Sequence, residues 1–454
     1  MKIIVVGCGK TGRTIVASLV KEHHDVTCID INANVVADLR DAYDVIALVG
    51  SGTDYENLKE VDAGKAELFI AVTGSDELNM LSCFAAKRMG AQHTVARIRD
   101  LENNDSSLGF MKRELELSLV INPERMAAEA VYNILRLPSA SNVEIFPRSR
   151  FEMIEIQLKA DSPLDGVMLA DLRKRSKEKF LICAVERGSE TIIPSGSFVL
   201  RSKDKVGIIA TRKDAPRVLA TLGVENISVK SVILLGAGTV SLYLAKMLLD
   251  GKHSVKLIDQ DRAVCEEVCE LLPDAATVIH GNGMMQDLLM EEGITDTDAF
   301  VALTGRDEDN ILISVYATRQ NVPKVVTKIN NRDLATLAES IGIESIVTPR
   351  KIVADLIVKY ARALENSMGS QIETLYSIMD DHAEALDFIV LDDFEYTGIP
   401  LKDLKFHPNV LIAGITRDRD TFIPTGNDVI LTGDHVIVIA EGKRILSLSD
   451  IIAG

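Results

Sequence analysis

The sequence repeats one glycine-rich pattern in each half of the chain. Apolar residues 3–6 lead into Gly7-Cys8-Gly9-Lys10-Thr11-Gly12, and apolar residues 232–235 lead into Gly236-Ala237-Gly238-Thr239-Val240-Ser241. An aspartate, Asp30 or Asp259, lies 23 residues after the first glycine of each copy, so both landmarks recur at an offset of 229. A strand, a glycine turn and an acidic residue at this spacing are typical of a nucleotide-binding unit. Two copies at one offset predict two such units.

Short apolar runs then alternate with helical patterns in both copies. Strands are expected at 45–49, 67–72 and 94–98 in the first copy, and at 277–279, 299–303 and 324–329 in the second. Helices are expected over 76–89 and from Glu308. Alternation of this kind indicates βαβ crossovers and a parallel sheet. Pro123 and Pro349 each begin a further long helical pattern. The sequence therefore predicts two Rossmann-like N domains.

A shorter, strand-rich block follows each predicted N domain. Residues 142–150, which include Pro147, are expected to form a linker before the first block. The two blocks match each other, since Ile193-Pro194-Ser195-Gly196 recurs as Ile423-Pro424-Thr425-Gly426. The prediction is an α/β tandem repeat in which each Rossmann-like parallel-sheet N domain precedes a small α+β C domain. The expected boundaries are 1–138, 144–225, 229–366 and 370–454.

Composition limits the classes of partner. The 454-residue chain is 47% apolar and carries a formal charge of −17, which argues against nucleic-acid binding because phosphate contacts need clustered Lys and Arg. No signal peptide precedes the first strand, and the apolar stretch 232–249 contains a Gly-x-Gly turn, so the expected location is the cytosol. The six cysteines form no metal-type CxxC pair, and no metal site is expected.

The first glycine turn predicts phosphate binding. Gly7 permits a sharp turn, Gly9 lets the backbone approach a pyrophosphate, and Gly12 lets the following helix pack on the sheet. The phosphates would then meet free N–H groups at the positive end of that helix. Asp30 is placed to bind both ribose hydroxyls of an adenosine and to repel a 2′-phosphate. NADP is therefore disfavoured, whereas NAD, ATP and ADP are not distinguished.

Further polar residues follow the later strands of the first copy. Ser51, Gly52 and Thr53 are expected near the adenine, and Thr73 and Gly74 across the mouth of the sheet. Ser75 is explained equally well as a helix N-cap.

Arg97 and Arg99 alternate along a strand, which predicts one shared face and suits a polyphosphate. Solvated strand-end arginines or a subunit salt bridge explain the pair about as well. The second copy has Lys328 and Asn330 there, and Ser241 in place of the third glycine. The second site is expected to favour a less charged ligand, to bind more weakly, or to have lost binding.

The candidate nucleotide-binding residues of the first copy are Gly7, Cys8, Gly9, Lys10, Thr11, Gly12, Asp30, Ser51, Gly52, Thr53, Thr73, Gly74, Arg97 and Arg99. Those of the second copy are Gly236, Ala237, Gly238, Thr239, Asp259, Asn282, Thr304 and Lys328. The eight histidines include no repeated or convergent pair, and no acid/base residue recurs in the C blocks. A dehydrogenase would need a proton relay. We therefore expect no catalytic residues.

These residues resemble a known family. The glycine turn with Asp30, the segment 72–79 and the segment 96–99 look like a KTN (RCK N-terminal) domain, and the strand-rich block looks like its C-terminal companion. The tandem pair resembles the cytosolic regulators of prokaryotic Trk potassium uptake systems. The resemblance implies a homo-oligomeric ring, dimeric or tetrameric, beneath an integral membrane potassium-translocating subunit of the Trk type, with NAD(H), ATP or ADP as regulatory ligands that change its conformation.

Within that family, nucleotide contacts correspond to Gly7, Gly9, Gly12, Asp30, Thr73, Arg97 and Arg99, and to Gly236, Gly238, Asp259, Thr304 and Lys328. Arg99 would reach a terminal phosphate, and the protein would be a regulator rather than an enzyme. The alternative hypothesis is an NAD-dependent oxidoreductase with two Rossmann units.

Overall fold

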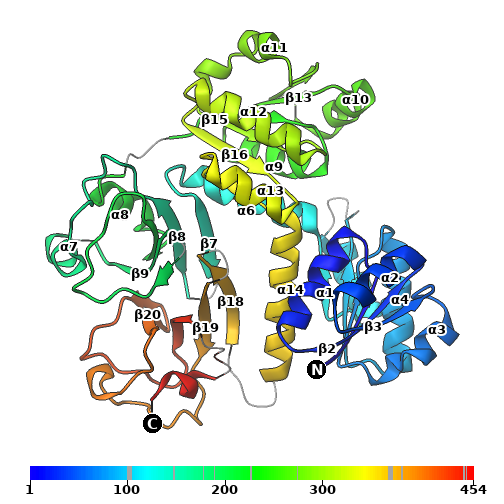
Figure 1. Ribbon diagram of the computed structural model, residues 1–454, viewed down its shortest axis with the longest axis horizontal. Coiled ribbons are helices and arrows are strands. Elements are labelled where there is room, and N and C mark those ends of the chain that lie inside the picture. The colour runs from blue at the N-terminus through cyan, green and yellow to red at the C-terminus, as the bar shows by residue number, and fades with distance from the viewer. Residues whose placement is uncertain are drawn as a thin grey trace. The chain divides into compact units, whose positions relative to one another are not determined.

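The computed structural model describes residues 1–99, 105–146, 149–176, 178–188, 190–224, 228–273, 275–366, 372–379, 382–442, 445 and 447–453. Two six-stranded parallel sheets and two five-stranded antiparallel sheets alternate along this part of the chain (Figure 1). The predicted fold class is confirmed. No helix among the described residues is long and apolar enough to span a membrane.

The first N domain is built on a parallel sheet of order β3-β2-β1-β4-β5-β6. Its strands are β1 (Lys2–Val6), β2 (Asp25–Asp30), β3 (Ile46–Val49), β4 (Leu68–Ala71), β5 (His93–Arg97) and β6 (Leu119–Ile121). They are joined through α1 (Lys10–Lys21), α2 (Ala33–Ala42), α3 (Tyr55–Glu60), α4 (Asp76–Met89) and α5 (Asp105–Glu114). The central strands β1 and β4 are almost wholly buried, as expected for a parallel sheet covered on both faces.

The second N domain has the same topology, with order β14-β13-β12-β15-β16-β17. Its strands are β12 (Ser231–Leu235), β13 (Ser254–Asp259), β14 (Ala276–His280), β15 (Ala299–Ala302), β16 (Lys324–Lys328) and β17 (Ile346–Val347). The intervening helices are α9 (Thr239–Asp250), α10 (Arg262–Leu271), α11 (Gln286–Glu291), α12 (Asp307–Arg319) and α13 (Arg332–Ser340). The repeat read from the glycine turns therefore extends through every strand of the sheet.

The C blocks form two equivalent antiparallel sheets. The first contains β7 (Asn142–Phe146), β8 (Phe151–Gln157), β9 (Phe180–Arg187), β10 (Glu190–Ile192) and β11 (Lys205–Thr211), with α7 (Leu169–Arg175) and α8 (Ala215–Thr221). The second contains β18 (Ile372–Ile378), β19 (Ala383–Ile389), β20 (Val410–Arg417), β21 (Asp420–Phe422) and β22 (His435–Glu441). The prediction of a linker over 142–150 is wrong for Asn142–Phe146, because this segment pairs with β8 and buries Phe146 as the edge strand β7. Positions 147 and 148 of that linker lie outside the described residues.

The two C sheets pack against each other through one apolar cluster. Phe151, Met153 and Ile209 of the first block share it with Ile378 and Ile439 of the second. The contact is close, since a Cβ added to Gly414 would lie 2.4 Å from the ring of Phe151. Thr416 Oγ1 also donates to the Ser149 carbonyl oxygen at 2.7 Å. Each C block thus completes the core of the other.

Two long helices do not stay with the repeat that encodes them. The chain forms two compact units, one of residues 1–127 and 348–361 and the other of residues 128–347 and 362–454. Helix α14 (Pro349–Asn366) is encoded in the second repeat (Figure 1), yet its residues 349–361 belong to the first unit and only its last turn belongs to the second. In the first unit the Tyr360 ring lies edge-on to His93 of β5. Helix α6 (Pro123–Arg136), encoded in the first repeat, begins in the first unit and ends in the second.

Candidate functional site

The first glycine turn has the geometry needed to hold a phosphate. Gly7 has φ +85°, and a Cβ there would lie 2.7 Å from the Thr73 backbone nitrogen. A Cβ on Gly12 would lie 2.0 Å from the Gly7 carbonyl oxygen. Gly9 occupies the N-cap of α1 and has no side chain to satisfy the first N–H groups of that helix. Those N–H groups and the positive helix end therefore meet at an exposed turn suited to an anion.

Asp30 lies at the end of β2 beside this turn. One carboxylate oxygen accepts the Cys8 N–H at 2.6 Å, and the other accepts the Asn32 N–H at 2.8 Å. Each carboxylate oxygen has a second lone-pair direction, which suits a ribose hydroxyl. The neighbouring Cys28 thiol, together with burial, raises the pKa of the Cys8 thiol far above its ordinary value. Cys8 is therefore a neutral packing group rather than a nucleophile.

A buried asparagine joins the ends of the next two strands. Asn79 of α4 is fully buried, and its Oδ1 accepts both the Thr73 N–H and the Thr73 hydroxyl at 2.7 Å. Its Nδ2 donates to the Arg97 carbonyl oxygen at 2.9 Å. This network fixes Thr73 and Arg97 at one edge of the sheet. Ligands of open α/β sheets bind at that edge.

The two arginines have different partners within the chain. Arg97 ends β5, and its guanidinium contacts Glu124 of α6 at 2.8 Å. Arg99 lies beyond the strand and contacts Asp76 at 3.4 Å and the Gly74 carbonyl oxygen. Because β5 ends before Arg99, strand alternation does not direct its side chain. Neither ion pair was expected, because the sequence offered only solvated arginines or a salt bridge between subunits as alternatives to a shared polyphosphate contact.

The remaining candidates of the first copy lie around the same edge. The Ser51 and Thr53 hydroxyls are 2.8 Å apart, and a Cβ on Gly52 would lie 2.2 Å from Val6 of β1. Lys10 is exposed in the first turn of α1, and Thr11 follows it. Ser75 caps α4 by accepting the Leu78 N–H at 3.2 Å, which is one of the two explanations that the sequence left open.

The second copy reproduces the backbone geometry of the first. Gly236 has φ +95° and Gly238 is the N-cap of α9, followed by the exposed Thr239. Asp259 accepts the Ala237 N–H at 2.7 Å. Asn310 accepts from the Thr304 N–H and hydroxyl and donates to the Lys328 carbonyl oxygen at 2.9 Å. The divergence between the copies therefore lies in side chains, not in the shape of the turn.

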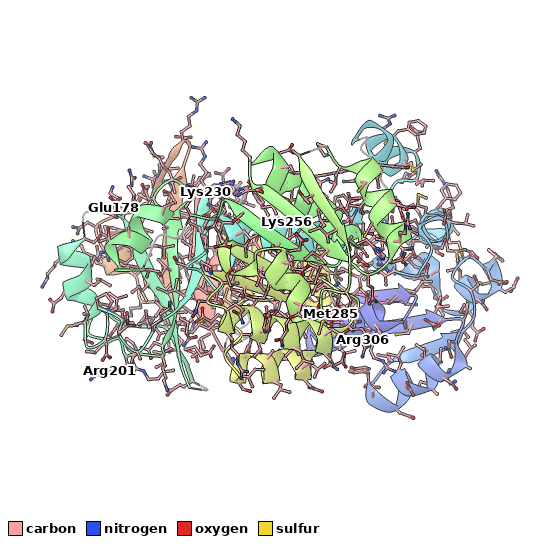
Figure 2. All side chains as sticks on the ribbon, turned by 90° about the horizontal axis from the view of Figure 1, so that it is seen from above. Glu178, Arg201, Lys230, Lys256, Met285 and Arg306 are labelled. Carbon is pink, nitrogen blue, oxygen red and sulfur yellow. The ribbon has the colours of Figure 1, made fainter. Side chains whose placement is uncertain are left out.

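Four side chains distinguish the second copy. The Ser241 hydroxyl, in place of Gly12, donates to the Gly236 carbonyl oxygen. Lys328 Nζ donates to the Leu303 carbonyl oxygen at 2.9 Å. Arg306 stands where the first copy has Ser75, and its side chain is 74% exposed (Figure 2). Asn282, in place of Ser51, accepts the Met284 N–H at 3.0 Å.

The family follows from two comparisons. The TrkA-N domain matches residues 3–123 and 232–349, and the TrkA-C domain matches residues 153–223 and 388–453. The Methanosarcina mazei protein named Trk system potassium uptake protein TrkA homolog 1 is 30% identical over 448 residues, 97% of each chain. The chain belongs to the TrkA family.

Other TrkA-family relatives match over a similar length. The Archaeoglobus fulgidus Trk system potassium uptake protein TrkA homolog is 30% identical over 99% of this chain and 100% of its own. The Halomonas elongata Trk system potassium uptake protein TrkA is 28% identical over 98% of this chain and 96% of its own.

Solved structures share the fold. The GsuK channel covers 97% of this chain and 77% of its own with a TM-score of 0.64 at 16% identity. The crystal structure of the GsuK RCK domain covers 97% of this chain and 92% of its own with a TM-score of 0.62, also at 16% identity. At this identity the likeness concerns the fold alone.

Sequence reasoning did not assign a role to Asn79 or Glu124. The signal for Asn79 was present, because Thr73-Gly74 and Asn79 recur as Thr304-Gly305 and Asn310 in this TrkA-family chain. A side chain that repeats together with a backbone turn indicates a structural network. Glu124 carries no such signal, since Arg350 occupies the matching position after Pro349.

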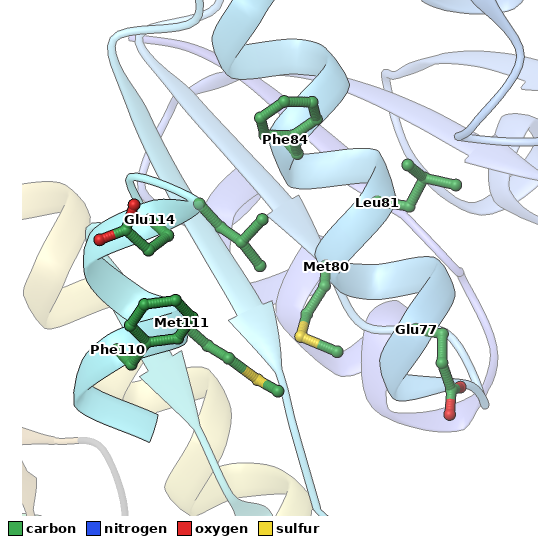
Figure 3. Close-up of a pocket in the computed structure, with 8 residues that line it drawn as sticks. Glu77, Met80, Leu81, Phe84, Phe110, Met111 and Glu114 are labelled. Carbon is green, nitrogen blue, oxygen red and sulfur yellow. The ribbon is translucent and has the colours of Figure 1, made fainter. Parts of the chain in front are cut away.

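An apolar groove lies between α4 and α5 (Figure 3). It has a volume of about 380 Å³ and is lined by Glu77, Met80, Leu81, Phe84, Phe110, Met111, Glu114 and Leu115. Phe110 is 56% exposed and Leu81 is 52% exposed. Leu312 matches Leu81 in the second copy and is 63% exposed on α12. An exposed leucine therefore recurs at the same position of this helix in both repeats.

Proposed function

We propose that this chain is a nucleotide-binding regulatory subunit of a Trk-type potassium uptake system. The relatives that match nearly the whole chain carry that system's name. The ligands are adenosine nucleotides, namely ATP, ADP or NAD(H). One structure of similar fold is described as the GsuK channel bound to NAD and another as GsuK bound to ADP.

The observation that carries the proposal is the position of Asp30 beside the exposed glycine turn. The carboxylate binds the ribose hydroxyls while the N–H groups at the start of α1 bind the phosphates. A 2′-phosphate next to this carboxylate is repelled, so NADPH binds less well than NADH. The Thr73 and Arg97 ends of β4 and β5 lie where the second half of the ligand would extend.

Regulation in this proposal needs no chemical step. A nucleotide that binds one conformation better than another shifts the population toward it, and its differential affinity sets the size of the shift. Coupling between two sites is typically about 1–3 kcal/mol. The two N domains give each chain two candidate sites, of which the second is expected to favour a less charged ligand, to bind more weakly or to have lost binding.

The partners are further copies of this chain and an integral membrane potassium-translocating subunit. The apolar groove between α4 and α5, and the matching exposed Leu312, suit assembly of N domains into a ring with a second copy of the chain. The protein would lie in the cytoplasm, on the inner face of the membrane, held there by its partner.

The test is calorimetric titration of the purified chain with ATP, ADP, NADH and NADPH, together with Asp30→Ala. Loss of a charge-assisted hydrogen bond costs about 1.5–3 kcal/mol, so we expect affinity for every adenosine nucleotide to fall at least tenfold. Asp25→Ala is the matched control, because Asp25 begins the same strand β2 and is exposed.

Two results would contradict the proposal. Equal affinities of wild type and Asp30→Ala for the nucleotides would show that Asp30 does not contact the ligand. Turnover of NADH with a small substrate would favour an oxidoreductase over a regulator. Thermal unfolding of each variant without ligand shows whether a lost affinity reflects a lost fold, since Asp30 also accepts the Cys8 N–H.

A further inference from the structure

The ion pair between Arg97 and Glu124 joins the candidate phosphate site to helix α6. Arg97 Nη2 lies 2.8 Å from Glu124 Oε1. The two side chains are only 16% and 21% exposed, so the pair is largely shielded from water. Glu124 is the second residue of α6, which follows β6. The parallel register places Arg97 beside Ile121 of that strand.

The pair leaves hydrogen-bonding capacity unused. Within the described part of the chain, Arg97 Nε and Glu124 Oε2 are both buried without a hydrogen-bond partner. An arginine fork can bind two oxygens of one anion, yet Arg97 contacts Glu124 through a single nitrogen–oxygen contact. A phosphate offers several oxygens and competes well for such a guanidinium.

The backbone holds Arg97 at the ligand edge of the sheet. Asn79 donates to the Arg97 carbonyl oxygen and accepts from Thr73, so the ends of β4 and β5 are tied together. Two strand spacings separate β5 from β1, about 10 Å in all. A di- or triphosphate that starts at the Gly9 turn can extend over that distance.

The released glutamate retains a favourable position. Glu124 lies in the first turn of α6, where the positive end of the helix dipole stabilises a carboxylate. The start of the helix is separately held by Asn122, whose Oδ1 accepts the Arg125 N–H at 2.9 Å. When a phosphate replaces the Glu124 carboxylate on Arg97, that carboxylate is still stabilised by the helix N-terminus. The exchange therefore costs less free energy than leaving a buried carboxylate with no favourable interaction.

We propose that Glu124 is an internal counter-ion that occupies Arg97 until a nucleotide phosphate displaces it, and that this exchange releases the first turn of α6 from its contact with β5. The proposal rests on the proposed nucleotide-binding function. Glu124 then determines which nucleotides act, because only a ligand whose phosphate reaches β5 can take Arg97 from it. Since α6 begins in one compact unit and ends in the other, the released turn belongs to a helix shared by both.

The second copy lacks this arginine–glutamate ion pair. Arg350 stands at the position that matches Glu124, and Lys328 stands at the position that matches Arg97. Two basic residues replace an ion pair, so the second site has no carboxylate at the position of Glu124. The two sites are therefore expected to respond differently to the same nucleotide.

The test compares wild type with Glu124→Gln by calorimetric titration of ATP, ADP and adenosine. Removal of the competing charge should raise ATP affinity roughly tenfold, whereas adenosine affinity should stay within about twofold because adenosine has no phosphate to reach Arg97. Glu129→Gln, an exposed change on the same helix, should match wild type. In an Arg97→Ala background, Glu124→Gln should have no further effect.

A second measurement follows α6 itself. ATP should speed hydrogen exchange of the amides in the first two turns of α6 in wild type, and Glu124→Gln should exchange fast with or without ATP. If Glu124→Gln binds ATP no more tightly than wild type, or if ATP leaves the hydrogen exchange of α6 unchanged, the counter-ion role of Glu124 is refuted. The proposed nucleotide regulation would not be affected by either result. If wild type binds none of the adenosine ligands, the proposed function itself fails.

Discussion

A buried lysine in the second N domain gives a sharp prediction. Lys324 begins β16, is 5% exposed, and donates from Nζ to the Ala140 carbonyl oxygen at 2.5 Å. Burial lowers the pKa of Lys324 from 10.5 to about 8, and Glu344 opposes this shift only in part. A downward shift of that size means that the charged form costs roughly 3 kcal/mol in the folded state.

The sign of the pH dependence follows from the two pKa values. Below pH 8 Lys324 is protonated in the folded and the unfolded chain, so the cost of burying the charge is constant. Between about pH 8 and 10.5 only the unfolded chain keeps the proton. The free energy of unfolding therefore rises with pH over this window, by about 1.4 kcal/mol per unit.

Lys324→Met removes the titrating group. At pH 7 the relief of the buried charge is offset by the loss of a donor to Ala140, which costs about 1–3 kcal/mol, so the variant should be close to wild type in stability. Above pH 8 the free energy of unfolding of wild type should rise relative to that of the variant by about 1.4 kcal/mol per pH unit. The assay is urea unfolding by circular dichroism at pH 7.0 to 9.5, with the exposed Lys230→Met as the control. Parallel wild-type and Lys324→Met profiles over the whole range would refute a depressed pKa.

Two glycines give further predictions. Gly12→Ala places a Cβ 2.0 Å from the Gly7 carbonyl oxygen, and this steric overlap should cost about 1–3 kcal/mol. In scanning fluorimetry with ADP, the ligand-induced rise in melting temperature should shrink or vanish. An undiminished rise would show that the turn tolerates the methyl group. Gly414→Ala places a Cβ 2.4 Å from the ring of Phe151 between the C sheets. Overpacking of about 1–3 kcal/mol should lower the calorimetric melting temperature by several degrees. The control Gly196→Ala meets no atom closer than 3.8 Å and should leave the melting temperature unchanged, and equal melting temperatures of the two variants would argue against a close-packed sheet contact.

Local patterns predicted most of the fold. The helix expected over 76–89 is α4 with those bounds, and the two prolines begin α6 and α14 as expected. These features depend on periodicity, caps and proline stereochemistry, which the sequence carries directly. The edge strand β7 was missed because its short run, flanked by Ser141 and Pro147, gains its hydrogen bonds only from β8.

The packing of α6 and α14 and the partners of the arginines could not be predicted. An amphipathic pattern shows that a helix has an apolar face, but not which sheet covers that face. Strand alternation placed Arg97 and Arg99 together, yet β5 ends at Arg97 and Asp76 draws Arg99 toward α4. The glycine turn and its aspartate were predictable because backbone geometry demands those residue types.

The place of α14 in the first compact unit has a consequence for synthesis. Residues 1–127 leave the ribosome early, whereas residues 348–361, which complete their unit, follow only after positions 128–347. At about 5–20 residues per second that interval is roughly 10–45 s. During this time the part of the first unit that residues 348–361 later cover faces the solvent or a chaperone; that segment contains Val353 and Ile357, which are both fully buried in the folded chain. The first half of the nascent chain therefore depends on the second half to finish folding, and a truncated product would expose that surface permanently.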